Sequence, residues 1–247
     1  MRDAYHEELE ALQAGLAEVG RAITLAIETA TAGLLDCDLT SAEKVIDGDE
    51  DIDQWRREIE RRTIDLIARQ QPVASDLRIL AATFRIISDF ERAGDHAVHL
   101  ALLTRRRYPK PAVPPEARVT VATMGDIASR LAGALLETLV TSDAARAASI
   151  ERQDDAMDSA YRELLRQILA PDWGYGVDTA LDLAQVGRYY ERFADHLVSA
   201  GKQIVFQVTG QYSPAAKKSP SVHPLFAERT GPLRLHSIAS ESSKADE

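Results

Sequence analysis

Two short acidic motifs occupy corresponding places in the two halves of the sequence. ERAGDH spans residues 91–96, and ERFADH spans residues 191–196, a hundred positions later. Each motif follows a pair of acids with the same four-residue spacing, namely Asp49 with Asp53 and Asp154 with Asp158. Two features that match in position and in spacing predict an internal repeat.

The acids of these motifs fall where helices should pack against one another. At about 100° per residue, Glu91 and Asp95 lie on or beside the apolar stripe of their helix. The other acid pairs have the same register against their own stripes. The candidate metal ligands are therefore Asp49, Asp53, Glu91, Asp95, Asp154, Asp158, Glu191 and Asp195.

Carboxylates in such positions repel one another and favour a bound cation. Two like charges at positions i and i+4 of a helix cost roughly 0.2–0.5 kcal/mol even when exposed, and partial burial adds to this cost. Where two such helices pack side by side, we expect four acids to converge with no cation among them. A multivalent ion would remove the repulsion, and oxygen ligands favour Mg²⁺, Mn²⁺, Ca²⁺ or iron over a closed structural zinc site.

The same residues have a simpler interpretation. Arg92 with Asp95, and Arg192 with Asp195, are i, i+3 pairs that would make surface ion bridges of little energetic value. The histidine that ends each motif points about 100° or more away from the acids and is predicted to lie on a solvated face. Only His99 faces the acid side, as an auxiliary ligand at best, and the second half has a serine at that position.

The elements that carry these acids are predicted to be long helices. Apolar residues recur at three- and four-residue spacing, and glycine and proline gather at a few breaks. This pattern predicts an all-α fold of two pseudo-symmetric three-helix bundles, six helices in total. The expected boundaries are 1–107 for the first bundle, 108–117 for a linker, 118–212 for the second bundle and 213–247 for a disordered tail.

Composition excludes several classes of function. The net charge is 29 − 39 = −10, which disfavours nucleic acid and anionic lipid as partners. The exception is a run of three arginines, residues 105–107, which we interpret as favourable charges at a helix C-terminus. A single cysteine, Cys37, and an acidic N-terminus without a signal peptide indicate a soluble cytoplasmic protein with no membrane insertion.

Two stretches resemble a known family. QQPVASDLR, residues 70–78, followed by SDFERAGDHAVHLA, residues 88–101, is similar to the PhoU family of phosphate-transport regulatory proteins. The resemblance spans about residues 5–210. It departs in the second half, where PDWGYGVD replaces PVASDLR and Ala194 stands in place of Gly94, so metal binding is less secure there.

The resemblance implies metal ions or multinuclear clusters on the bundle surface, held by the eight acids named above. The ions would be divalent or trivalent with oxygen ligands, such as iron, manganese, magnesium or zinc. It also implies a negative regulator of phosphate-starvation signalling, which contacts a sensor histidine kinase and the ATPase of the phosphate ABC transporter. We further expect a homodimer and no enzymatic activity.

Two rival functions remain. A dinuclear metal enzyme in a helical bundle would use a Glu-x-x-His pair from each of two helices, and neither motif has that spacing. Nor is there a Ser-His-Asp constellation or a glycine-rich phosphate loop. A metal-free helical scaffold would keep the same architecture without the metal chemistry.

Overall fold

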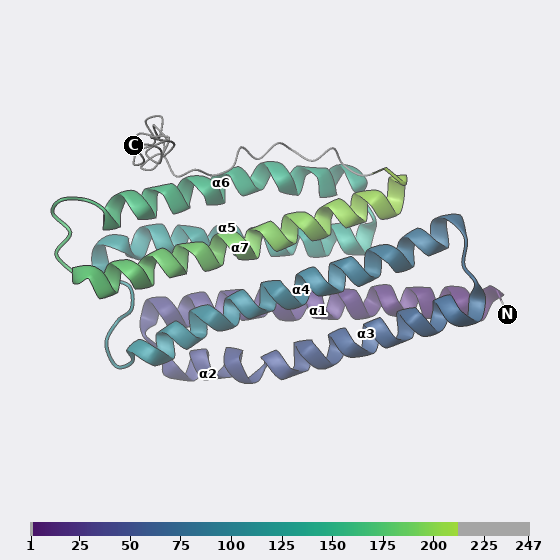
Figure 1. Ribbon diagram of the computed structural model, residues 1–247, viewed down its shortest axis with the longest axis horizontal. Helices are drawn as coiled ribbons and strands as arrows, with labels where there is room; N and C mark the ends of the chain where they lie inside the picture. Colours follow the sequence, from purple (N-terminus) through teal and green to yellow (C-terminus); the bar gives the residue numbers. More distant parts are fainter. Residues whose placement is uncertain (1, 212–247) are drawn as a thin grey trace, which may run out of the picture. The chain divides into compact units, whose positions relative to one another are not determined.

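The structure, a computed structural model, describes residues 2–211, and the predicted tail lies outside them. The described residues form helices without any strand, which confirms the predicted all-α class. The helices are α1 (Arg2–Asp36), α2 (Leu39–Asp47), α3 (Asp49–Gln70), α4 (Ala74–Arg107), α5 (Pro115–Thr141), α6 (Ala144–Ile168) and α7 (Gly176–Thr209) (Figure 1).

Two three-helix bundles lie side by side within this unit. The first bundle has α1 and α4 packed together, with α2 and α3 along their outer side. In the second bundle α5 and α7 pack together, and α6 lies against both (Figure 1). The most extensive packing between any two helices joins α4 to α7, and α1 packs on α5. The helices that carry the repeated motifs, α4 and α7, therefore form the centre of the unit.

The second predicted helix is divided in two at Gly48. This glycine keeps right-handed helical angles, φ −72° and ψ −11°, and its N–H donates to the carbonyl of Lys44 at 3.1 Å. The interruption is therefore short, and α2 and α3 together take the place of one helix. The start of α2 is fixed by Asp38, whose side chain accepts from the backbone N–H of Thr40 at 2.9 Å.

Local sequence features explain where α5 and α6 begin and where α7 ends. Pro115 is the first residue of α5, so the last three residues of the segment interpreted as a linker form the first turn of this helix. Asp143 caps α6 by accepting from the N–H groups of Ala145 at 2.9 Å and Arg146 at 3.0 Å. Gly210, with φ +73°, ends α7 in the left-handed conformation that glycine adopts without strain.

The two halves share one hydrophobic core and are joined by polar contacts across it. Asp182 of α7 is only 6% exposed, and it accepts from Arg106 Nη2 at 2.5 Å and from Arg107 Nε. Tyr190, fully buried in α7, forms a hydrogen bond of 2.8 Å with Thr31 of α1. The arginine run was interpreted as helix-end charges, and two of its three members instead connect the halves.

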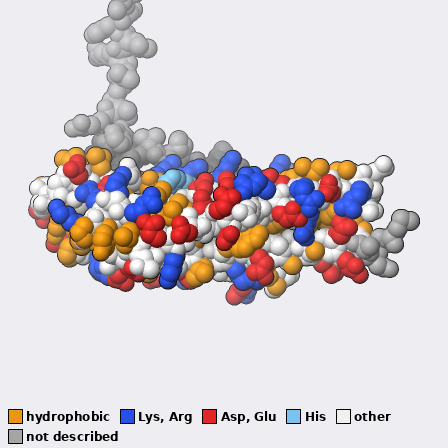
Figure 2. Space-filling view, turned by 90° about the horizontal axis from the view of Figure 1, so that it is seen from below, with side chains coloured by type: hydrophobic (Ala, Val, Ile, Leu, Met, Phe, Trp, Pro, Cys, Tyr) orange, Lys and Arg blue, Asp and Glu red, His pale blue; other side chains and the backbone are white. Residues whose placement is uncertain are grey.

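Helix α5 is long and apolar enough to cross a membrane by length and composition alone. Half of its apolar window is buried inside the structure, as is common for the core helix of a bundle. On the face shown in Figure 2, acidic and basic side chains are interspersed along the helices. The net negative charge therefore forms no continuous acidic surface on that face.

Candidate metal centre

The first acidic seam consists of Asp49 and Asp53 from α3 and Glu91 and Asp95 from α4. All four side chains are partly buried, and α3 packs directly against α4. Burial is the main cause that raises the pKa of Asp49, and the charges of Asp95 and Asp53 raise it further. The structure thus brings the two acid pairs of the first half together at the edge where the helices meet.

The pKa values of the two carboxyls on α4, Glu91 and Asp95, are raised by the same causes. Burial raises the pKa of Glu91, and Asp95 and Asp53 add to the rise while Arg56 opposes it. Burial also raises the pKa of Asp95, again with a contribution from Asp53 and with His99 opposing. Each of these acids is therefore harder to ionise than an exposed carboxyl, as expected for a site that would gain from a cation.

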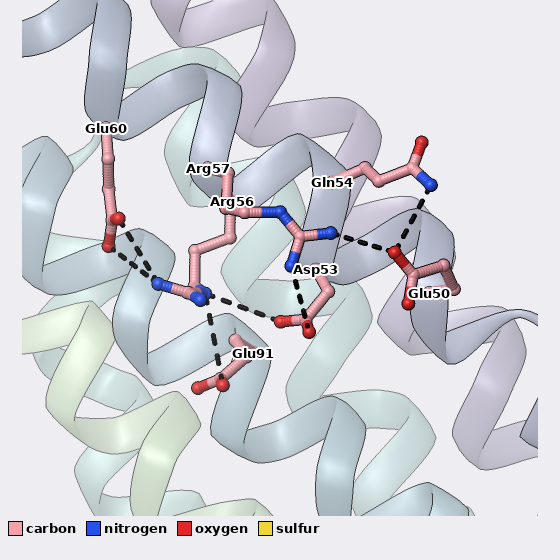
Figure 3. Close-up of polar contacts among 7 residues, drawn as sticks. All are labelled: Glu50, Asp53, Gln54, Arg56, Arg57, Glu60 and Glu91. Carbon is pink, nitrogen blue, oxygen red and sulfur yellow. Dashed lines mark hydrogen bonds and ion pairs between the residues drawn. The ribbon is translucent and has the colours of Figure 1, made fainter.

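One part of the prediction is wrong, because a cation already lies in this seam. The Arg56 guanidinium approaches Asp53 with 3.5 Å between Nε and Oδ1, and Glu91 with 3.9 Å between Nε and Oε1 (Figure 3). Its Nη1 also lies 3.2 Å from both carboxylate oxygens of Glu60. The available signal for Arg56 was its i, i+3 spacing from Asp53, which places the two residues on the same helix edge, and the sequence prediction did not include this pair.

The second acidic seam consists of Asp154 and Asp158 from α6 and Glu191 and Asp195 from α7. Asp154 is 2% exposed, the most buried of the eight acids. Burial raises the pKa of Glu191, Arg188 opposes the rise, and Asp195 and Asp158 add to it. The acids of α6 and α7 therefore influence one another across the helix pair, as those of the first half do.

The cations of the second seam come from the helix that carries the acids. Arg188 is hydrogen-bonded to Glu191, and Arg192 Nη1 lies 3.3 Å from Asp195 Oδ2. The second of these is the i, i+3 ion pair that the sequence offered as the simpler interpretation. About half of each arginine side chain is exposed, 51% for Arg188 and 42% for Arg192.

The donor chemistry of both seams fits a hard cation, since each seam is lined by carboxylates from two helices. However, nowhere in residues 2–211 do three or more His, Cys, Asp or Glu side chains already stand close enough to hold an ion. A metal would thus require side-chain rearrangement, first of all by Arg56. The eight ligands remain a prediction.

The histidines were predicted to face solvent, and this is wrong for His196. It is 8% exposed, and its Nδ1 lies 3.0 Å from Oδ1 of Asp89 in α4. The His196 ring stacks on His96 with 5.6 Å between centroids, and His99 stacks on Tyr189 at 4.9 Å. The prediction treated each bundle alone, whereas the face opposite the apolar stripe of α4 is covered by α7.

The packing of histidines and Tyr189 between α4 and α7 also shifts the pKa of His96. Burial lowers the pKa of this imidazole to about 4, and the nearby His196, His99 and two arginines lower it further. His96 is therefore neutral at physiological pH. The twofold repetition of histidine after each aspartate was the available signal that these side chains meet where α4 packs on α7.

Comparison with known proteins assigns the family. The family model described as the PhoU domain matches residues 16–104 and again residues 121–204, which together make up more than half of the chain. The chain belongs to the PhoU family. The two matched segments coincide with the two bundles, so the repeat predicted from the acid motifs is a repeat of the PhoU domain.

Curated PhoU relatives match along nearly the whole chain. The "Phosphate-specific transport system accessory protein PhoU homolog 2" of Mycobacterium tuberculosis is 39% identical over 212 residues, covering 86% of this chain and all of the relative. PhoU homolog 1 of the same species is 40% identical over 210 residues, covering 85% and 95%. These relatives are named accessory proteins, which confirms the expectation of a family that is not enzymatic.

Solved PhoU structures have the same fold. The phosphate transport system regulatory protein PhoU from Streptococcus pneumoniae superposes with a TM-score of 0.76 at 24% identity, covering 85% of this chain and 99% of that one. PhoU from Pseudomonas aeruginosa gives 0.75 at 26% identity, covering 84% and 100%. The two-bundle architecture is thus that of the PhoU proteins.

Proposed function

We propose that this PhoU protein is an accessory protein of a phosphate-specific transport system in the cytoplasm. The observation that carries the proposal is the identity of about 40% to accessory proteins of that name over 85% of the chain. In this role it bridges the transporter ATPase and a sensor histidine kinase when phosphate is plentiful, and it holds the kinase in its inactive state. The mechanism is one of binding, in which each partner must prefer one state of the adaptor.

The two acidic seams would hold divalent or trivalent ions, with iron, manganese, magnesium and zinc as candidates. A bound ion neutralises the partly buried carboxylates. The chain itself contributes the carboxylate oxygens of α3 with α4 and of α6 with α7, and the helices of each pair pack against one another. An ion that joins two helices would rigidify the outer face of each bundle, where α3 and α6 are available to a partner.

The adaptor role is tested by capture of the partners. The purified protein, immobilised, should retain the transporter ATPase and the cytoplasmic part of the histidine kinase, and both together when phosphate is present. Retention of neither partner under any phosphate concentration would contradict the adaptor role. A homodimer, which we also propose, is tested separately by light scattering of the same preparation.

The metal is tested by elemental analysis of the purified protein. We expect bound metal in the unaltered protein and a large loss in the double variant Glu91→Gln, Asp95→Asn, with helicity unchanged. The double variant Glu7→Ala, Glu10→Ala removes two exposed charges from α1 and is the matched control. Equal metal content in all three proteins would refute the ligand assignment, and absence of metal from all three would favour the metal-free scaffold.

A further inference from the structure

The guanidinium of Arg56 holds a central place in the first acidic seam. It stands between two helices and contacts Asp53 and Glu91, one acid from each (Figure 3). Only 27% of its side chain is exposed, which is much less than for the neighbouring Arg57 at 51%. Arg56 is therefore packed into the seam and is the arginine that reaches Glu91. The more exposed Arg57 pairs with Glu50 on the outer side of α3, and its Nη1 also lies 3.5 Å from Oδ2 of Asp53.

The second half has no such cation at the equivalent position. Arg56 follows Asp53 by three residues, and the residue that follows Asp158 by three is Tyr161. Glu60, which holds the far side of Arg56, corresponds to Leu165. The ion pair of α3 is thus replaced on α6 by two partly buried apolar or aromatic side chains.

The Tyr161 ring is fixed by its contacts. A Cβ atom placed on Gly187 of α7 would lie 2.5 Å from Cδ2 of this ring, so the ring rests directly on the α7 backbone. Burial raises the pKa of the Tyr161 phenol, and the charge of Glu191 raises it further, so the phenol stays neutral beside this acid. The two seams therefore have the same acid types and differ at one position of the facing helix, where α3 has the charged Arg56 and α6 has the neutral Tyr161. The cations of the second seam, Arg188 and Arg192, come from α7 instead.

We propose that Arg56 is a built-in counterion of the first acidic seam and competes with a metal ion for Asp53 and Glu91. This inference rests on the proposed metal binding. A guanidinium and a divalent ion on the same carboxylates repel one another, so each weakens the binding of the other. Metal binding in the first half is thus favoured when Arg56 moves away, and Arg56 sets how tightly the first seam holds an ion.

The structure provides a place for the displaced side chain. Nη1 of Arg56 is already within 3.2 Å of both oxygens of Glu60, which is not among the predicted ligands. Arg56 can keep this pair on α3 while its Nε moves away from the seam. Replacement of Arg56 by a neutral residue should therefore free Glu91 and leave Asp53 with Arg57 alone, without breaking the packing between α3 and α4.

The test measures Mn²⁺ affinity by isothermal titration in the full chain. The background variant Glu191→Gln, Asp195→Asn removes the second seam, so only the first seam is titrated. In this background, Arg56→Gln should tighten Mn²⁺ binding by about fivefold or more, the size of effect expected for a partly exposed ion pair. Arg61→Gln is the matched control, because it removes the same charge from α3 where the pairs are with Glu58 and Asp65. It should change the affinity by less than about twofold.

A second variant separates charge from shape. Arg56→Lys keeps the positive charge, so its Mn²⁺ affinity should stay close to that of the background. Unchanged or weaker affinity in Arg56→Gln overturns the competition, as does equal tightening by glutamine and lysine. Absence of Mn²⁺ binding in the background and in Arg56→Gln overturns both this inference and the metal site itself. Circular dichroism of each variant verifies that the helices remain intact.

Discussion

Nδ1 of His196 in α7 lies 3.0 Å from Oδ1 of Asp89 in α4, across the boundary between the two PhoU domains. Both side chains are nearly buried, with 10% and 13% of their surface exposed. His196→Ala should therefore leave a buried carboxylate without this partner, at a cost of roughly 1–3 kcal/mol of unfolding free energy. The melting temperature should fall by about 2–4 °C for each kcal/mol.

Thermal unfolding followed by circular dichroism at pH 7 measures this loss. His6→Ala is the control, because His6 is exposed near the start of α1. That variant should melt within about 1 °C of the unaltered protein, as surface changes usually do. An equal loss in both variants would mean that the contact between Asp89 and His196 adds no specific stability.

Asp182 forms the second polar link between the domains. It is 6% exposed and pairs with Arg106 and Arg107 at the end of α4. Asp182→Asn keeps the shape, removes the charge and turns one of the two acceptor oxygens into an NH₂ donor, so the two arginines lose their shared anionic partner. We expect a loss of roughly 2 kcal/mol in urea unfolding.

The control for this link is an exposed ion pair of similar length. Arg118 and Asp36 lie 2.6 Å apart, with 47% and 65% of their side chains exposed. Asp36→Asn should therefore cost less than about 0.5 kcal/mol. If both asparagine variants lose the same free energy, burial of the Asp182 pair does not matter and the prediction is wrong.

The periodicity of the sequence was sufficient to predict the helices and the packing inside each bundle. It was insufficient to predict the contacts between the two bundles. Spacing of apolar residues identifies the stripe by which α4 packs in its own bundle. The opposite side of α4, with Asp89 and His96, has a polar pattern that is also typical of a solvated face. Only the packing of one domain on the other shows that these polar residues contact His196 of α7.

The positions of the acid pairs, in contrast, could be predicted from sequence spacing alone. A four-residue spacing fixes Glu91 and Asp95 to the same edge of a helix, whatever that edge packs against. The sequence could not show that Arg56 enters this edge, because a long arginine side chain reaches neighbours on either side of its helix. Which acids meet an arginine depends on the approach of α3 to α4, and this is a property of the tertiary structure.

The raised pKa of Asp95 predicts how its removal affects stability. Burial is the main cause of the rise, with Asp53 adding to it and with His99, His196 and Arg56 opposing it. A carboxyl whose pKa is higher in the folded protein than in the unfolded chain stabilises the fold when protonated. That contribution is present below the ordinary pKa near 3.8 and is lost as pH rises through the higher folded value.

Asp95→Asn should therefore stabilise the metal-free protein at pH 7, by roughly 0.5 kcal/mol. The difference from the unaltered protein should vanish as pH falls below the ordinary carboxyl range. Hydrogen bonds from Arg61 and Arg62 lower the pKa of Glu58 to about 2, so the stability that Glu58 contributes is lost as pH falls. Both proteins contain Glu58, so this contribution cancels in the difference between them. Urea unfolding at several pH values, with a chelator present, measures the difference. The measured quantity is the unfolding free energy of the variant minus that of the unaltered protein. If this difference is lower at pH 7 than at pH 4, the prediction is wrong.

Gly187 and Gly133 should respond to alanine in opposite directions. A Cβ on Gly187 would lie 2.5 Å from the Tyr161 ring and 3.0 Å from Leu164, so the ring must move. A Cβ on Gly133 would have no heavy atom within 4 Å. Alanine favours a helix over glycine by roughly 0.5–1 kcal/mol, so Gly133→Ala should stabilise α5 by that amount. Gly187→Ala should instead destabilise the protein by roughly 1–3 kcal/mol, because the clash outweighs the gain in helix propensity.

The Tyr161 contact can be isolated by a double-mutant cycle. In a Tyr161→Ala background the added methyl group of Gly187→Ala has room, so its cost should fall by at least roughly 1 kcal/mol. Urea unfolding of the four proteins gives this coupling directly. If Gly187→Ala costs the same with and without the Tyr161 ring, the ring does not rest on the α7 backbone as described. The neutral neighbour of the second acidic seam would then be free to move, and the contrast with Arg56 would lose its structural basis.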